Sequence, residues 1–178
     1  YIADMRQELK TGNRTIFSRK LYELISDRLN KHEQIMLFLN KRGTAGFVSC
    51  RSCGYVMKCP HCDVSMTLHR NGKLVCHYCG YETPNVSLCP ECGSKYILGF
   101  KAGTEAVEDA VKKMFPAARV LRMDMDTTKG KDGHENILSA FATEQADILI
   151  GTQMIVKGHD FPKVTLVGVV AADISLYA

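Results

Sequence analysis

The sequence predicts an α/β fold, a parallel sheet with helices on both faces that is interrupted by a small cysteine-rich β insertion. Two observations lead to this prediction. Outside residues 47–99, short apolar runs alternate with amphipathic helical patterns, which is typical of parallel strands joined by helices. All 8 cysteines fall between residues 50 and 92, so a single segment departs from that alternation.

Two elements are expected before the cysteines. Residues 18–32 carry apolar side chains on one stripe at helical spacing, which predicts an amphipathic helix. Residues 34–40 form a short apolar run that Lys41, Arg42 and Gly43 end. This pattern predicts a buried strand followed by a turn.

The alternation resumes after the last cysteine. A helix is expected to begin with Thr104 as its N-cap and to end before Pro116, with acidic residues near its positive end. The pattern then predicts a strand, a helix and two more strands, at residues 119–123, 134–144, 147–150 and 164–170. The longest apolar run, residues 164–172, is far too short to span a membrane and predicts a buried strand.

The cysteines form four Cys-x-x-Cys pairs, Cys50/Cys53, Cys59/Cys62, Cys76/Cys79 and Cys89/Cys92. Each pair presents two thiolates to one tetrahedral ion, and two pairs complete a closed Cys₄ shell of the structural kind. Disulfides fit less well, because nothing in the sequence indicates a secreted protein. Iron in an S₄ site is the closer alternative. Zinc is favoured because two sites occur in tandem without any other redox feature.

The residues that follow the pairs support metal binding. Gly54, Gly80 and Gly93 each follow the second cysteine of a pair, and Asp63 follows the remaining one. The backbone must turn sharply there to aim its amides at sulfur, and glycine adopts a positive φ without penalty. Aspartate is among the few other residues that tolerate this conformation.

Chain spacing predicts which pairs share an ion. The segment between Cys62 and Cys76 is expected to form two short strands around Asn71-Gly72, a strong hairpin signal. A hairpin brings its ends together, so the two flanking pairs should form an inner site and the other two an outer site. The expected inner ligands are Cys59, Cys62, Cys76 and Cys79, and the expected outer ligands are Cys50, Cys53, Cys89 and Cys92. Three nearby histidines exceed the ligand count and are expected to be exposed: His61, His69 and His77.

The formal net charge of +4 is weak evidence for a nucleic-acid partner. Eight thiolates on two Zn²⁺ ions would reduce the total to about zero. DNA binding would therefore depend on local patches. One candidate patch in residues 41–73 has a single acid, Asp63, and a solvated face explains it equally well. Its basic residues are Lys41, Arg42, Arg51, Lys58, Arg70 and Lys73.

Several motifs in this order resemble the bacterial replication-restart DNA helicases, the PriA or primosomal protein N′ family. They are LFLNKRG before the first cysteine, the four pairs, GTEAVEDAV, RMDMD and GTQMIVKGHDFP. The resemblance covers nearly the whole chain. It implies a superfamily 2 helicase in which two RecA-like lobes clamp ATP and move 3′→5′ on DNA, with a zinc module inserted in the second lobe.

The resemblance also implies a division of this chain and roles for single residues. Residues 1–46 would begin the second RecA-like lobe, 47–99 would be a zinc-ribbon-type insertion with two Cys₄ sites, and 100–178 would continue the lobe. Three residues would lie near DNA: Thr104, Thr152 and Gln153. Two would lie near ATP: Gly158 and Asp160. From the residues alone, a turn glycine and a helix or turn cap are equally good interpretations of this last pair.

Two parts of such a motor fall outside the sequence, the first lobe with its phosphate loop and the arginine-bearing motif expected after Asp173. The chain also opens without an initiator methionine, which indicates a piece of a longer protein. Phosphoryl transfer needs all the parts together. We therefore expect no catalytic residue here and no ATP hydrolysis by this segment alone, with ATP and Mg²⁺ bound by the intact protein.

The chain is thus expected to be part of an ATP-driven helicase that restarts stalled forks and assembles the primosome. The expected partners are forked or single-stranded DNA, primosome proteins and single-strand-binding protein, without a membrane, in the bacterial cytoplasm at the nucleoid. An alternative of another class is a non-enzymatic zinc-ribbon module that binds nucleic acid or protein.

Overall fold

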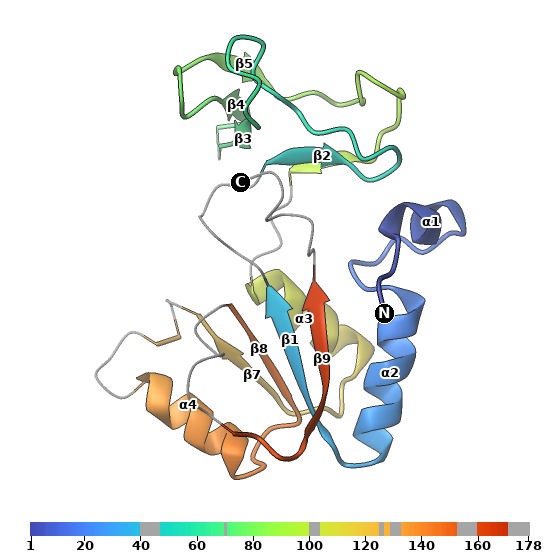
Figure 1. The fold of residues 1–178 in the computed structure, drawn as a ribbon, viewed down its shortest axis with the longest axis vertical. Coiled ribbons are helices and arrows are strands. Elements are labelled where there is room, and N and C mark those ends of the chain that lie inside the picture. Colours follow the sequence, from blue (N-terminus) through green and yellow to red (C-terminus); the bar gives the residue numbers. More distant parts are fainter. Residues whose placement is uncertain are drawn as a thin grey trace. The chain divides into compact units, whose positions relative to one another are not determined.

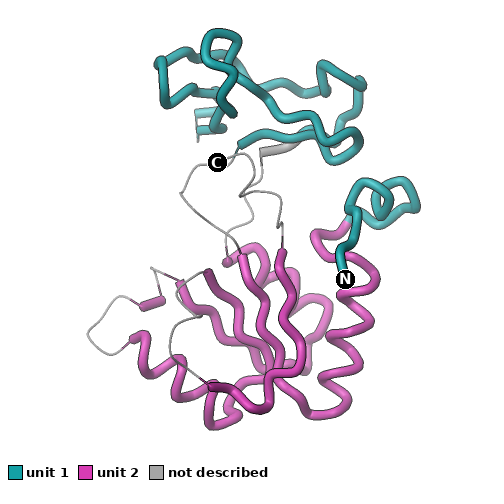
Figure 2. The backbone as a smooth tube through the Cα atoms, in the orientation of Figure 1, with its two compact units in different colours: residues 1–14, 42–101, 176–178 teal, residues 15–41, 102–175 magenta. Residues whose placement is uncertain are grey.

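The computed structural model describes residues 1–39, 47–69, 71–99, 104–124, 127–128, 133–152 and 160–170. The chain divides into two compact units, shown in Figure 2. The cysteine-rich unit comprises residues 1–14, 42–101 and 176–178, and the sheet unit comprises residues 15–41 and 102–175. None of the described helices has the length and apolar character needed to cross a membrane.

A four-stranded parallel sheet forms the centre of the sheet unit. Its strands are β1 (Gln34–Leu39), β7 (Val120–Met123), β8 (Ile148–Gly151) and β9 (Val164–Val170). They lie in the order β7-β8-β1-β9, and each pair of neighbours runs in the same direction (Figure 1). The predicted strands are confirmed to within about two residues at each end.

Helices cover both faces of this sheet, as the alternating pattern predicted. They are α2 (Arg19–Asn30), α3 (Thr104–Met114) and α4 (Gly133–Ala142). Ile25 of α2 and Val107 of α3 share one buried cluster with Leu37 of β1. Phe141 of α4 joins a second cluster with Leu149 of β8. Neighbouring residues of β8 belong to different clusters, so the two clusters lie on opposite faces of the sheet.

Strand β9 is less buried than the predicted buried strand. Val167 and Val169 are 59% and 51% exposed, whereas Gly168 faces α2 so closely that an added Cβ would lie 3.0 Å from Leu21. These valines are exposed because the described helices cover only part of the sheet face on which they lie. The described helix on that face, α4, packs chiefly against β7 at the other side of the sheet, so the outward-facing valines of β9 remain open to solvent.

The cysteine-rich unit contains two small antiparallel sheets. One pairs β2 (Val48–Cys50) with β6 (Ile97–Gly99), and the other holds β3 (Thr67–Leu68), β4 (Lys73–Val75) and β5 (Glu82–Pro84) in that order. The hairpin predicted around Asn71-Gly72 is confirmed as β3–β4. Gly72 has a φ of 78°, and its amide donates to the carbonyl of His69 at 3.1 Å.

The first residues of the chain group with the cysteine-rich unit. Helix α1 (Met5–Lys10) begins after Asp4, whose side chain accepts a hydrogen bond from the Arg6 amide. The guanidinium of Arg51 donates to the carbonyls of Asn13 and Arg14, both at 3.0 Å. These bonds tie the segment to the outer cysteines. The expected boundaries of the insertion, residues 47 and 99, stay a prediction.

Candidate metal centres

Eight cysteine sulfurs gather in two groups of four within the cysteine-rich unit. The outer group is Cys50, Cys53, Cys89 and Cys92, and the inner group is Cys59, Cys62, Cys76 and Cys79. Within each group the ligand atoms all lie within 4.8 Å of one another. These are the two sets that the hairpin argument predicted.

The distances between sulfurs distinguish a metal site from a disulfide. The Sγ atoms of Cys50 and Cys92 lie 3.7 Å apart, as do those of Cys53 and Cys89, and the Sγ atoms of Cys59 and Cys79 are 3.6 Å apart. A tetrahedral zinc with Zn–S bonds of about 2.3 Å separates its sulfurs by about 3.8 Å, whereas a disulfide bond is about 2.0 Å long. The two groups therefore fit two structural zinc ions and contain no disulfide.

Every Cys-x-x-Cys pair adopts the same local turn. The amide of the residue after the second cysteine donates to the carbonyl of the first, at 2.8–2.9 Å in all four pairs. That residue has a positive φ each time, as predicted from its identity. The values are 85° at Gly54, 56° at Asp63, 76° at Gly80 and 68° at Gly93.

A second hydrogen bond also recurs in all four turns. The amide of the first cysteine donates to the carbonyl of the residue five positions later, with distances of 2.7–2.9 Å. The first cysteine of each pair is accordingly buried, while Cys79 and Cys92 are exposed. Ser52 and Ser94 join the two outer turns through a 2.7 Å contact between their hydroxyls. The backbone thus fixes both sites in position through bonds of its own.

The thiols of each group oppose one another's ionisation. The hydrogen bond with the neighbouring Cys79 thiol, together with burial, raises the pKa of Cys62 to about 12. The backbone amide of Cys79 outweighs burial at Cys76 and lowers the pKa of that thiol to about 7. Four thiolates at such short range need a cation to balance their charge. A divalent ion bound in each group would offset half of that negative charge.

The three histidines of this unit lie outside both tetrads, as expected. The ring of His61 packs edge-on against Tyr81, with ring centroids 5.0 Å apart. His69 and His77 face each other, and their Nε2 atoms are 3.1 Å apart. His61 and His77 are exposed and His69 is partly buried.

Two of the candidate DNA contacts lie at the carboxyl end of the sheet. Thr152 follows β8 directly and is partly buried. Thr104 is 6% exposed and is the first residue of α3, so it differs from the predicted N-cap. Its hydroxyl donates to the carboxylate of Asp124, which follows β7. Gln153 lies outside the described residues.

The candidate nucleotide residues are placed differently. Asp160 is exposed and precedes β9, so it lies toward the amino end of the sheet, opposite to Thr152. Gly158 lies outside the described residues. Among the described residues, Thr104 and Thr152 therefore lie at the carboxyl ends of the strands, and Asp160 lies at their amino ends.

Asp124 lies beside Thr104 and is a further candidate site residue that was not predicted from the sequence. Besides the Thr104 hydroxyl, its carboxylate accepts a hydrogen bond from the Thr127 amide at 2.9 Å and lies 3.3 Å from the Arg122 guanidinium. It thereby connects the end of β7 to the start of α3. Its place directly after an apolar strand was the available signal, because polar residues at the carboxyl ends of parallel strands often serve binding sites.

Comparison with known proteins adds to this geometry. The family model described as PriA DNA helicase Cys-rich region (CRR) domain matches residues 59–84, which contain the inner tetrad. The chain is 57% identical over 177 residues to the replication restart protein PriA of Bacillus subtilis (strain 168), covering 99% of this chain and 22% of that protein. It is 50% identical to the Synechocystis protein of the same name, over 97% of this chain and 21% of that protein. For the Haemophilus influenzae protein the identity is 37%, over 100% of this chain and 24% of that protein.

Proposed function

We propose that the intact protein, a PriA replication restart protein of which this chain is a segment with a zinc-binding cysteine-rich region, is an ATP-dependent 3′→5′ DNA helicase. It would restart stalled forks and assemble the primosome. One observation carries the proposal. The similarity to these relatives extends over 97–100% of this chain, across both units. The chain spans about a fifth to a quarter of their length.

The two units would have different functions in the helicase. The sheet unit would serve as the second RecA-like motor lobe, which needs a first lobe to form an ATP site. The cysteine-rich unit would assist strand separation and contact primosome proteins or single-strand-binding protein. Separate buried clusters in the two units support this division. The protein would act in the bacterial cytoplasm, where its DNA substrate lies.

Thr104 and Thr152 lie at the carboxyl ends of the strands, where open α/β sheets generally bind ligands. Thr152 and the adjacent Gln153 would contact the DNA backbone. The hydroxyl of Thr104 is already bonded to Asp124. Thr104 would therefore contribute its position at the amino end of α3, where helix amides attract phosphate.

The proposed nucleotide contacts are Gly158 and Asp160. Residues 153–159 connect the carboxyl end of β8 with the residues before β9. A DNA contact at Thr152 and an ATP contact at Asp160 would thus be joined by one short segment. Such a connection would couple nucleotide turnover to movement along DNA.

The test uses the intact protein with forked DNA, Mg²⁺ and ATP. Asp160→Ala is expected to lower DNA-stimulated ATP turnover at least about tenfold, the scale of one lost charge-assisted contact, while two zinc equivalents remain bound. Asp147→Ala serves as the control, because Asp147 is paired with Arg119 and belongs to no proposed site. An intact wild-type protein without DNA-stimulated ATPase activity would refute the helicase proposal.

A wild-type protein without DNA-stimulated ATPase activity would favour the alternative of a non-enzymatic zinc module. The specific observation behind this alternative is the buried cluster of the cysteine-rich unit, which includes Met66, Leu74 and Ile97. A unit with its own core and two ions can present a binding surface without a motor. DNA or primosome binding without ATP turnover would distinguish it.

A further inference from the structure

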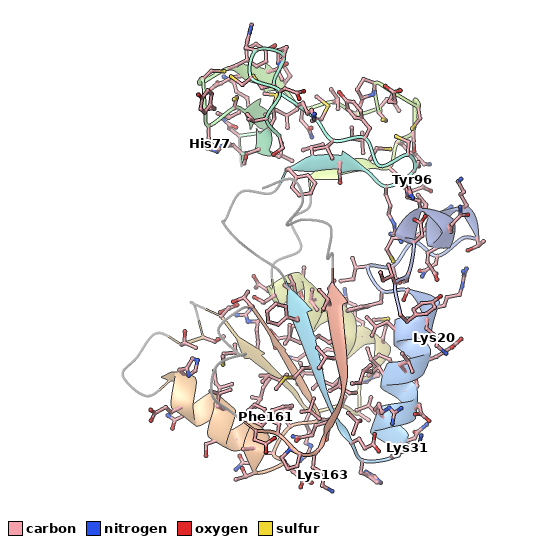
Figure 3. The ribbon with its side chains drawn as sticks, viewed as in Figure 1. Lys20, Lys31, His77, Tyr96, Phe161 and Lys163 are labelled. Carbon is pink, nitrogen blue, oxygen red and sulfur yellow. The ribbon has the colours of Figure 1, made fainter. Side chains whose placement is uncertain are left out.

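The cysteine-rich unit contains a pair of facing histidines that neither zinc site uses. The Nε2 atoms of His69 and His77 lie 3.1 Å apart, and their ring planes are inclined by 43°. Figure 3 labels His77 within this unit. His69 follows β3, and His77 lies between two inner-site cysteines.

Both histidines are held by ordered backbone. The amide of His69 donates to the carbonyl of Lys73 at 2.9 Å, and its own carbonyl accepts from Gly72 at 3.1 Å. His77 lies inside the turn closed by the 2.9 Å bond from the Gly80 amide to the Cys76 carbonyl. The hairpin and the turn therefore present the two rings to each other before any ligand binds.

The separation of the nitrogens suits a shared metal ion. Two imidazole nitrogens on one ion at about 2.0–2.1 Å lie about 3.4 Å apart in a tetrahedral site and about 2.9 Å apart in an octahedral one. The observed 3.1 Å falls between these values. A hydrogen bond between the rings has a similar length, but it needs a proton on one nitrogen. A metal ion would take the place of that proton, with both Nε2 lone pairs as donors.

The surrounding charges favour a cation. Four thiolates and one Zn²⁺ leave the inner site with a net charge of about −2, and His77 directly follows its ligand Cys76. Among the described residues, Lys73 carries an opposing charge nearby, and it forms a 2.9 Å ion pair with Glu82. The zinc–thiolate cluster therefore adds a negative potential at the histidine pair, which attracts a cation.

We propose that His69 and His77 bind one divalent transition-metal ion outside the two Cys₄ sites. The ion is of the class that imidazole prefers, Zn²⁺, Ni²⁺ or Cu²⁺. With two protein ligands the site keeps open positions for water or for an oxygen ligand of another molecule. It is thus a surface site of a different kind from the closed sulfur sites.

The test titrates NiCl₂ into untagged protein that already holds two zinc equivalents. Calorimetry is expected to show one bound Ni²⁺ with no zinc released, and ¹H–¹⁵N spectra should show paramagnetic broadening that is strongest at His69 and His77 and declines with distance from them. His69→Asn and His77→Asn are each expected to abolish this equivalent. His61→Asn is the matched control, because His61 also lies between two inner-site cysteines but packs against Tyr81.

The proposal fails if the wild type binds no Ni²⁺, if binding survives in both pair variants, or if His61→Asn removes it equally. Zinc content is measured in every variant. If His77→Asn disturbs the inner zinc, His69→Asn decides the question, because His69 lies outside the Cys-x-x-Cys turns.

Discussion

The sheet unit and the cysteine-rich unit are stabilised in different ways. The sheet unit buries large aliphatic and aromatic side chains on both faces of a parallel sheet. In the cysteine-rich unit, half of the buried cluster consists of cysteines, Cys50, Cys59, Cys76 and Cys89, and its strands have two or three residues each. One unit therefore depends on burial of apolar surface, and the other depends on metal.

Removal of metal should produce the largest difference between the two units. A structural zinc contributes roughly 10–16 kcal/mol in peptide systems, so a strong chelator is expected to unfold the cysteine-rich unit. Helices α2, α3 and α4 should persist because their core contains no ligand. Amide hydrogen exchange followed by mass spectrometry would show lost protection in the cysteine-rich unit and retained protection in the sheet unit.

A local version of that experiment is Cys59→Ser, which removes one inner ligand. The variant should lose the inner zinc and the protection of β3 and β4, with the far-UV helical signal retained. Collapse of the entire far-UV signal would contradict the independence of the two units.

The converse experiment weakens the sheet unit. Phe141 is fully buried and packs edge-on against Phe161 with ring centroids 5.3 Å apart. Phe141→Ala should lower the free energy of unfolding by about 3–5 kcal/mol, measured by urea denaturation with helical signal as the readout, while zinc content stays at two equivalents. Val169→Ala is the control, because that side chain is half-exposed and should cost much less.

A smaller effect is expected from the backbone of the metal turns. A Cβ at Gly80 would meet no atom within 4 Å, yet its φ is 76°. Gly80→Ala should therefore weaken the inner site only through backbone strain, about 1–2 kcal/mol, measured as a lower zinc affinity in chelator competition. Gly80→Asp should retain more affinity, because Asp63 occupies the equivalent position. Equal losses in both variants would argue against strain as the cause.

The smallest effect concerns pH and the sheet unit. The hydrogen bond from the Arg119 guanidinium, partly opposed by burial, lowers the pKa of Asp147 below its usual 3.8. A lowered folded-state pKa adds stability that is complete well above pH 4 and is lost as the pH falls through the folded-state value. The urea midpoint of the helical signal should fall between pH 5 and pH 3, and Asp147→Asn should reduce this slope. Chelator-treated protein avoids interference from zinc release.

The longer elements and the cysteine sites could be predicted from the sequence, whereas most of the short contacts could not. Helix α2 and strands β1 and β9 carry enough periodic residues to be recognised, and the hairpin followed from Asn71-Gly72. Helix α1 and strand β5 are too short to show a period. The pairing of β2 with β6 joins segments separated by all four cysteine turns, so no local pattern marks it.

Exposure and hydrogen-bond partners were harder to predict. Strand β9 was expected to be buried because its residues are apolar, but the position of a strand in the sheet decides which of its faces are covered. Thr104 was recognised as the start of a helix, whereas its bond to Asp124 depends on β7 ending beside α3. The facing of His69 and His77 likewise depends on the hairpin and the turn together.

The nesting of one tetrad within the span of the other implies an order of assembly. Closing a loop costs more entropy when more flexible chain must be confined. Once the inner ion holds Cys59 and Cys79 together, the flexible loop between Cys53 and Cys89 is effectively shorter. The entropic cost of closing that loop at the outer site then falls by roughly 1 kcal/mol. Metal uptake should therefore be stepwise and cooperative, with the inner site filling first.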